Sequence, residues 1–181
     1  MAQRFESIDE LKNHFGITAN EAIELCADVE SDVLEQARVV SETIDVDDLP
    51  QALEIAEKMC ERALGHVESD FEVGDWRFID ADAINDIQQE ELSNDLYMLG
   101  CFTDWFLANA TDIDIEVIQA LQEAEAFEAL GKLVLPHIAE IQAEYASTDG
   151  YGHHFNRYDG EEYEISGVVG THSNWYAFRT N

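Results

Sequence analysis

A row of acidic residues recurs at helical spacing near the start of the chain. The row consists of Glu21, Glu24, Asp28, Asp32 and Glu35. Steps of three and four residues place these side chains on one face of an α-helix. Carboxylates four residues apart lie about 6 Å apart along a helix axis, and phosphates on one DNA strand advance about 3.4 Å each. The row therefore resembles every second phosphate of a nucleic-acid strand in pitch and in charge.

Further acidic residues extend this pattern along the chain. Asp45, Asp47 and Asp48 follow the end of the same predicted helix. Two more sets have helical spacing: Glu54, Glu57 and Glu61, and then Asp112, Glu116 and Glu123. Like charges four residues apart destabilise a helix by roughly 0.2–0.5 kcal/mol per pair, and lysines that could relieve the repulsion are few. We take all fourteen acidic residues as candidate partner-binding residues.

The overall charge supports a partner of opposite sign. The 181-residue chain has 40 Asp and Glu residues against 9 Lys and Arg, a formal net charge of -31. Direct binding to nucleic acid depends on neutralising phosphates, and adhesion to an anionic membrane needs basic residues as well. We therefore expect neither. A net charge of about 2–8 in magnitude is enough for solubility, so the excess indicates another role.

The charge is spread through segments that have helical periodicity. Residues 1–80 include 21 acidic and 6 basic side chains, and residues 81–146 include 14 acidic side chains and one basic side chain, Lys132. Residues 147–181 include 5 acidic and 2 basic side chains. Hydrophobic residues make up 46% of the chain, enough for a folded core. No stretch is long and apolar enough to span a bilayer. We expect an acidic folded domain rather than an acidic tail.

Capping boxes and apolar stripes predict helices over most of the chain. Ser7–Glu10 opens a short helix that ends near Gly16, and Thr18–Glu21 opens a long one that reaches about Thr43. Asp47 or Asp48 caps a third helix, with Pro50 in its first turn and Gly65 at its end. Later helices are expected from about Asp80 or Asp82, from Ser93 through a buried segment Leu96–Ala108, over Ile113–Leu130, and from Lys132 to Ala146 with a break at Pro136.

Strand signals are concentrated near the end of the chain. Asp159-Gly160 is typical of a two-residue hairpin turn, with His153–Tyr158 and Glu161–Ile165 as its strands. Trp175–Arg179 is a further strand, and the alternation around Gly74-Asp75 predicts another hairpin that can join the sheet. The predicted fold is α+β and mostly α, with at least five helices and a small C-terminal antiparallel sheet. We expect an acidic helical region over residues 1–146 and a sheet over residues 147–181, packed together as one domain.

In composition, size and acidic helix faces, residues 6–146 resemble the DNA-mimicking anti-restriction and anti-CRISPR proteins of phages and mobile elements. The resemblance includes no aligned motif, so it assigns a role to no individual residue. It implies a protein that occupies the basic nucleic-acid-binding surface of another protein, such as a restriction enzyme or CRISPR effector, and inhibits it competitively. It also implies no enzymatic activity and a location in the host cytoplasm if the chain is phage-encoded.

Enzyme chemistry is the weaker interpretation of the remaining residues. His153, His154 and His172, with Asp149 and Asp159, could make a metal site, but adjacent strand residues point to opposite faces. Cys26, Cys60 and Cys101 lie on apolar helix faces and contain no CxxC pair, which is typical of free thiols in a cytoplasmic protein. Tyr97, Phe102, Trp105 and Phe106 are expected in the core. We expect no catalytic residue, cofactor or metal.

Two alternatives stay open. A cytosolic protein of an extreme halophile also has many acids and few lysines, and it would lose its fold in dilute buffer. A metal-dependent enzyme would use the region from His153 to His172. Its bound metal would be detected by elemental analysis of the purified protein. In the mimic, the less acidic sheet with Trp175, Tyr176 and His172 could form the contact of a homodimer.

Overall fold

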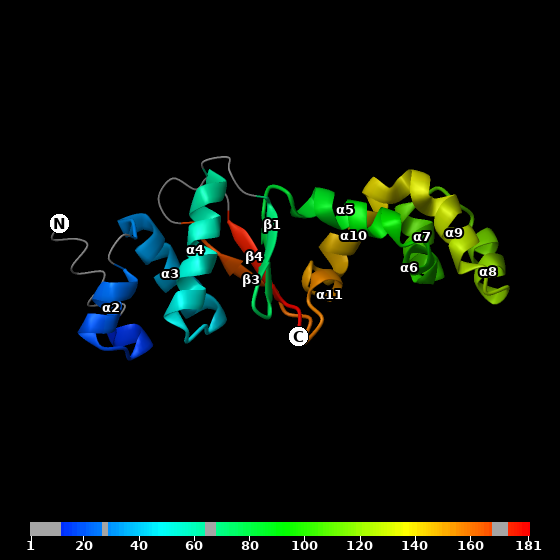
Figure 1. Ribbon diagram of the computed structural model, residues 1–181. Coiled ribbons are helices and arrows are strands. Elements are labelled where there is room, and N and C mark those ends of the chain that lie inside the picture. The colour runs from blue at the N-terminus through cyan, green and yellow to red at the C-terminus, as the bar shows by residue number, and fades with distance from the viewer. Residues whose placement is uncertain (1–11, 27–28, 64–67, 168–173) are drawn as a thin grey trace. The chain divides into compact units, whose positions relative to one another are not determined.

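The computed structural model of the chain describes residues 12–26, 29–63, 68–167 and 174–181 (Figure 1). The chain divides into two units. The first, here the sheet unit, comprises Met1–Asp82 and Phe155–Asn181, and the second, here the helical unit, comprises Ala83–His154. The boundary expected at residue 147 coincides with neither junction.

The sheet unit combines helices from the start of the chain with strands from two distant segments. Residues 12–15 are helical, and Gly16 follows them with a φ angle of 64°. The further elements are α2 (Ala19–Leu25), α3 (Ser31–Ile44), α4 (Leu49–Ala63), β1 (Asp70–Val73), β2 (Trp76–Asp80), β3 (Tyr163–Ile165) and β4 (Trp175–Arg179). The four strands form one antiparallel sheet in the order β1-β2-β4-β3. The predicted α+β fold, mostly α with a small antiparallel sheet, is confirmed.

The hairpin expected around Gly74-Asp75 is present. Val73 pairs with Trp76 across it, and Gly74 has a φ angle of 60°, which a residue without a Cβ adopts at little cost. Strand β2 also pairs with β4, so that Trp76 lies opposite Arg179 and Asp80 opposite Trp175. The hairpin is therefore continuous with the C-terminal strands, as the sequence predicted.

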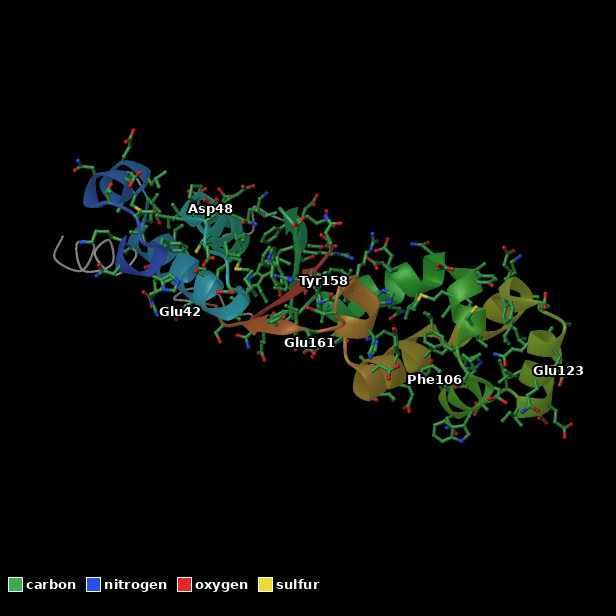
Figure 2. All side chains as sticks on the ribbon, turned by 90° about the horizontal axis from the view of Figure 1, so that it is seen from below. Glu42, Asp48, Phe106, Glu123, Tyr158 and Glu161 are labelled. Atoms are coloured by element: carbon green, nitrogen blue, oxygen red, sulfur yellow. The ribbon has the colours of Figure 1, made fainter. Side chains whose placement is uncertain are left out.

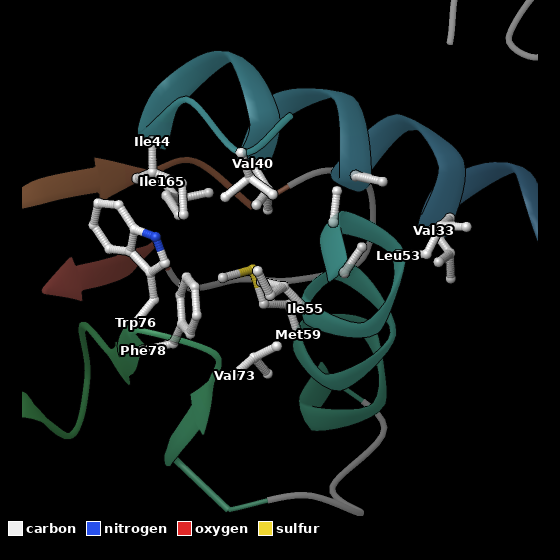
Figure 3. Packing of buried hydrophobic residues seen from close by; sticks show 14 of the residues in the cluster. Val33, Val40, Ile44, Leu53, Ile55, Met59, Val73, Trp76, Phe78 and Ile165 are labelled. Atoms are coloured by element: carbon white, nitrogen blue, oxygen red, sulfur yellow. The ribbon is translucent and has the colours of Figure 1, made fainter. Parts of the chain in front are cut away.

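One face of the sheet packs against α3 and α4 (Figure 3). The predicted α3 stripe of Val33, Ala37, Val40 and Ile44 is buried. Facing it are buried side chains of α4 and of the strands: Leu53, Ala56, Met59, Val73, Trp76, Phe78, Ile165 and Trp175. The Asp48 carboxylate accepts a hydrogen bond from the Gln51 amide at 3.1 Å, which confirms Asp48 as the predicted cap of the third helix. Gly65 lies outside the described residues, as does Ser7–Glu10.

The long helix expected from Thr18 to Thr43 is instead two helices. The predicted capping box at Thr18 and Glu21 is confirmed, but α2 ends at Leu25. Glu30, with a φ of -68° and a ψ of 152°, then precedes α3. A second helix start brings Asp32 into a first turn, where a negative charge is stabilised by the helix dipole. The β-branched Val29 also weakens helix propensity at the break.

The helical unit contains shorter helices than the sequence indicated. They are α5 (Ile84–Asn94), α6 (Leu96–Cys101), α7 (Asp104–Ala110), α8 (Ile115–Glu123), α9 (Phe127–Val134), the 3-10 turn η1 (Leu135–His137) and α10 (Ile138–Asp149). Their shared core consists of Leu92, Leu99, Leu107, Ile118, Leu130, Val134, Ile141 and Tyr145. The predicted break at Pro136 is present: Pro136 lies in η1, which separates helix α9 from helix α10.

Caps at polar residues divide the segments that were predicted as single helices. The Thr103 hydroxyl accepts from the Phe106 amide at 3.3 Å and starts α7, so Leu96–Ala108 is two helices. Asp95 and Asp114 cap α6 and α8, where Ser93 and Asp112 were expected. Glu125 adopts a φ of 52° and separates α8 from α9 within Ile113–Leu130. The cap expected for α5 at Asp80 or Asp82 is wrong too, since Ala83 precedes α5 without a side-chain cap.

The predicted hairpin at Asp159-Gly160 is wrong. Residues Gly152–Phe155 form helix α11, and β3 pairs with β4 rather than with the segment before it. Asn156 organises the intervening loop: its side-chain oxygen accepts from the amides of Tyr158 and Asp159 at 2.9 and 3.1 Å, and its amide group donates to the Glu161 carbonyl at 2.6 Å. The buried Asn156 side chain thus provides hydrogen bonds to the backbone of this turn, which in a hairpin would come from the paired strand.

Candidate acidic interaction surfaces

The expected row on the second helix is divided by the break between α2 and α3. Glu21 and Glu24 lie on α2, Asp32 and Glu35 lie on α3, and Asp28 is outside the described residues. Glu21 accepts hydrogen bonds from the hydroxyl and amide of Thr18 at 2.6 and 2.9 Å, which lower its pKa. Its carboxylate therefore serves the capping box of α2. The four described residues do not form one continuous phosphate-like row.

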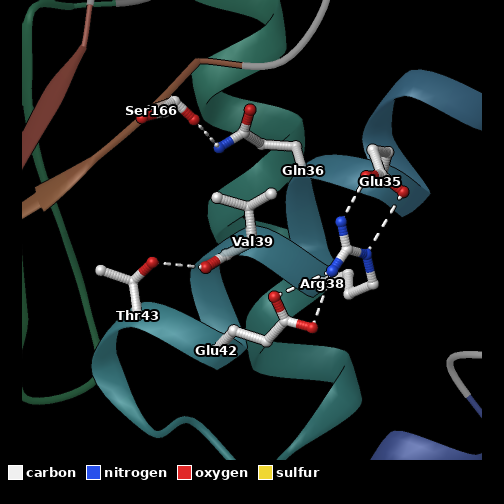
Figure 4. Close-up of polar contacts among 7 residues, drawn as sticks. All are labelled: Glu35, Gln36, Arg38, Val39, Glu42, Thr43 and Ser166. Carbon is white, nitrogen blue, oxygen red and sulfur yellow. Dashed lines mark hydrogen bonds and ion pairs between the residues drawn. The ribbon is translucent and has the colours of Figure 1, made fainter.

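Arg38 occupies part of the α3 surface and neutralises it (Figure 4). Its guanidinium donates to both carboxylate oxygens of Glu42 at 2.7 and 2.8 Å and to Glu35 at 2.5 Å. The hydrogen bond from Arg38 lowers the pKa of Glu35, so this carboxylate stays ionised but already has a cationic partner. Glu35 is consequently a poorer candidate for contact with a basic protein than the sequence indicated.

Helix α4 presents an acidic face that matches the predicted spacing. Glu54, Glu57 and Glu61 are all exposed, and steps of three and four residues place them on one side of this 15-residue helix. No ion pair with another described side chain involves them. Lys58 lies between them in sequence, but its Nζ lies 5.6 Å from the ring centre of Phe71. We call these three residues the α4 acidic face.

Other candidate acids of the sheet unit lie outside the α4 acidic face. Asp45, Asp47 and Asp48 are exposed in the connection between α3 and α4, where Figure 2 labels Asp48. Burial, followed by the charges of Asp32, Glu30 and Glu57, raises the pKa of the Cys60 thiol to about 11. Asp32 of α3 and Glu57 of α4 therefore lie close enough to act on the same thiol. The raised pKa leaves Cys60 protonated and a poor nucleophile at neutral pH.

In the helical unit, α8 presents a second acidic face. Glu116 and Glu123 are exposed on one side of α8, whereas Asp112 is exposed in the segment before it. Gln119 lies between the two glutamates on the same side, and its Nε2 donates to Oδ2 of Asp104 on α7 at 2.6 Å. This bond, and a second from the Trp105 amide, lower the pKa of Asp104 and hold it ionised. We call Asp104, Glu116 and Glu123 the α7–α8 acidic face.

Asp104 is a candidate residue that sequence reasoning missed. It is fifteen residues from Gln119 and on a different helix, so no helical spacing relates it to α8. The expectation that Tyr97 and Trp105 lie in the core is also wrong, because they are 57% and 67% exposed. Phe102 and Phe106 are partly buried and stack at a centroid distance of 4.9 Å against the core of the helical unit, as expected.

Few basic side chains compensate these acids. Arg77 pairs with Asp70 at 2.6 Å, and Arg179 lies over the rings of Trp76 and Tyr158. The helical unit, all of whose residues are described, has fourteen acidic residues and one basic residue, Lys132. Its formal net charge is -13. Such a surface produces a strong negative potential that attracts basic macromolecules.

Two of the histidines considered for a metal site lie on a helix. His153 and His154 lie on α11 rather than on the predicted strand, and His172 lies outside the described residues. Among the described residues, no group of three or more His, Cys, Asp or Glu side chains is arranged to hold a metal ion. His14 lies 2.8 Å from the Ser41 hydroxyl, but that hydroxyl is buried and donates to the Val46 carbonyl at 2.7 Å. This Ser–His pair is therefore structural.

A comparison with known proteins gives no match to a family model, to a curated protein or to a solved structure. Within the described part of the chain, every helix is too short or too polar to cross a membrane.

Proposed function

We propose that this chain is an acidic nucleic-acid mimic. It occupies the basic DNA- or RNA-binding surface of another protein and inhibits that protein competitively, in the manner of anti-restriction and anti-CRISPR inhibitors. The single observation that carries the proposal is the α4 acidic face. Glu54, Glu57 and Glu61 project from one side of an ordered helix, and no described cation pairs with them.

The spacing on α4 supports a phosphate-like role. Glu54 and Glu61 are separated by seven residues, or about 10.5 Å along the helix axis at a rise of 1.5 Å per residue. Three phosphate steps on one strand cover about 10.2 Å. A basic groove that contacts a strand at these intervals can pair with Glu54 and Glu61 in the same register. The α7–α8 acidic face offers comparable spacing on the helical unit.

Electrostatics favours a protein partner over other ligands. Association between a strongly acidic surface and a basic cleft is accelerated by long-range attraction, and like charge excludes nucleic acid itself as the ligand. Each exposed ion pair contributes only about 0–1 kcal/mol, so affinity must come from many carboxylates. The loss of binding should therefore increase with the number of acids changed.

The test begins with capture at low salt. The chain is immobilised, host lysate is passed over it, and retained proteins are eluted in three parallel arms with duplex DNA, with RNA or with polyglutamate. Elution by nucleic acid at concentrations where polyglutamate is ineffective supports the proposal. If polyglutamate elutes the retained proteins as readily as nucleic acid does, the binding is that of a general polyanion, and mimicry is contradicted.

A further inference from the structure

Trp105 differs from the other two tryptophans of the chain in its exposure. Trp76 and Trp175 are 6% and 1% exposed in the sheet unit, whereas Trp105 is 67% exposed on α7. Tryptophan is on average a highly buried residue, and it is over-represented among the residues that dominate binding interfaces. An indole left in water on a folded helix therefore points to an interaction.

The packing of α7 explains why Trp105 faces solvent. Leu107 is fully buried, and Phe106 stacks on Phe102 within the core of the helical unit. Successive helical residues are rotated by about 100°, so the side centred between Phe106 and Leu107 is opposite the side that carries Asp104 and Trp105. The outward position of Trp105 is thus fixed by two core residues.

Trp105 also adjoins a carboxylate whose position is fixed. The amide of Trp105 donates to Oδ1 of Asp104 at 2.8 Å, and Oδ2 of Asp104 accepts from Gln119 at 2.6 Å. An exposed aromatic ring consequently lies beside the α7–α8 acidic face. An unpaired nucleotide has the same two parts, a planar ring free to stack and a nearby negative charge. Bases in a duplex are already stacked on their neighbours and have no free face.

We propose that Trp105 takes the place of an unpaired base, and that the partner is a protein that binds single-stranded nucleic acid. Such proteins combine a basic groove with aromatic side chains on which successive bases stack. The groove complements the net charge of -13 on the helical unit, and its aromatic side chains provide a stacking surface for the indole. This inference rests on the proposed function and narrows the class of partner.

Two competition assays test the inference with defined probes. The chain is titrated against labelled oligothymidine bound to a single-strand-binding protein with an OB-fold, and against labelled duplex bound to a helix-turn-helix repressor. The unaltered chain should displace oligothymidine at lower concentration than it displaces the duplex. Trp105→Leu should weaken displacement of oligothymidine by about 5- to 150-fold, the range expected for one stacked ring. Trp105→Phe should retain most of the displacement of oligothymidine. Tyr97→Leu, which removes another exposed aromatic ring, should leave displacement unchanged.

Failure of the inference is distinguishable from failure of the proposed function. If the unaltered chain displaces neither probe, both are contradicted. If it displaces the duplex as well as the single strand, or if Trp105→Leu competes as well as the unaltered chain, mimicry stands and the role of Trp105 is overturned. Sedimentation velocity gives a further check, because a dimer that dissociates in Trp105→Leu would show that the indole binds a second copy instead.

Fluorescence provides a readout that does not depend on variants. Since Trp76 and Trp175 are buried, quenching by acrylamide reports mainly on Trp105. Binding to the single-strand-binding protein, with its own tryptophans replaced by phenylalanine so that aromatic stacking surfaces remain, should protect the emission from acrylamide. Emission that stays equally quenchable in the complex contradicts stacking of Trp105.

Discussion

Gln119 on α8 donates a hydrogen bond to the carboxylate of Asp104 on α7 at 2.6 Å, and the bond brings a third carboxylate to a helix face that has two of its own. The acids that matter for the proposed surface are thus positioned by tertiary contacts as well as by helical spacing. The same bond lowers the pKa of Asp104, so the carboxylate remains charged to more acidic pH than an isolated aspartate.

Gln119→Ala should raise the pKa of Asp104 toward its ordinary value. The reason is that the side-chain hydrogen bond from Gln119 is the largest cause of the lowered pKa, and it favours the ionised form. A pH titration of the Asp104 carboxyl carbon by NMR measures the shift. Gln89→Ala on α5 is the control and should leave this titration unchanged. An Asp104 curve that is identical in Gln119→Ala and the unaltered chain would show that the bond is not formed in solution.

Arg38→Gln should make stability less dependent on acid pH. The folded pKa of Glu35 lies below its unfolded value because of Arg38, so the pair stabilises the fold at neutral pH, and this contribution is lost as the pH falls through the folded pKa. Both side chains are about one third exposed, so the loss at pH 7 should be small, about 0–1 kcal/mol. Urea unfolding of both proteins at pH 7 and pH 3 measures it, and the difference between them should shrink at pH 3. A difference that grows at pH 3 would contradict the assignment.

Gly100→Ala and Gly131→Ala should each destabilise the helical unit. A Cβ at Gly100 would overlap the carbonyl of Phe127, and a Cβ at Gly131 would overlap the carbonyl of Leu96, so α6 and α9 could not approach as closely. Overpacking of this kind lowers the free energy of unfolding by about 1–3 kcal/mol. Here the overlapping atoms belong to the backbone, which cannot move aside as a flexible side chain can. Thermal unfolding followed by circular dichroism measures the cost. Ala129→Ser, at an exposed position on α9, is the control and should change stability by no more than about 0.5 kcal/mol.

The sequence predicted the fold class and most of the sheet unit because those features depend on local signals. The Thr18–Glu21 box, the α3 stripe and the Gly74 hairpin are each encoded by neighbouring residues, and all three are present. The breaks at Thr103 and Glu125 were missed because an apolar pattern continues across them, although Thr103 caps α7 through a local hydrogen bond. The loop around Asn156 was missed because Asp159-Gly160 is also typical of a hairpin turn.

The candidate surfaces were predictable to a similar degree. Spacing alone identified Glu54, Glu57 and Glu61, since one uninterrupted helix carries them. Spacing could not show that Arg38 forms an ion pair with Glu35. Nor could it show that Gln119 on α8 forms a hydrogen bond with Asp104 on α7. The apolar segment around Trp105 predicted a core position for it. In a helix only one side can face the core, and Phe106 and Leu107 occupy that side of α7, so Trp105 faces solvent.

Reversal of the α4 acidic face should remove most of the competition with nucleic acid while the fold survives. Three exposed pairs at about 0.5–1 kcal/mol each correspond to an affinity loss of roughly 10- to 150-fold. The variant is Glu54→Lys, Glu57→Lys and Glu61→Lys together, and the three glutamine replacements should give a smaller loss. The matched control reverses Glu68, Asp82 and Glu161 to lysine, which changes the net charge equally at exposed positions of the sheet unit outside α4. Equal losses in the two reversed variants would assign the effect to net charge rather than to α4.

The most direct test of mimicry is a competition titration between this chain and nucleic acid for the captured partner at two salt concentrations. The Debye length contracts from about 10 Å at 0.1 M to about 3 Å at 1 M, so pairing between exposed carboxylates and Lys or Arg should weaken steeply over that range. The account predicts that the chain and nucleic acid exclude each other from the partner at 0.1 M salt, and that the chain's affinity falls steeply by 1 M. A partner that binds both at once, or that holds the chain equally tightly at both salt concentrations, would contradict it.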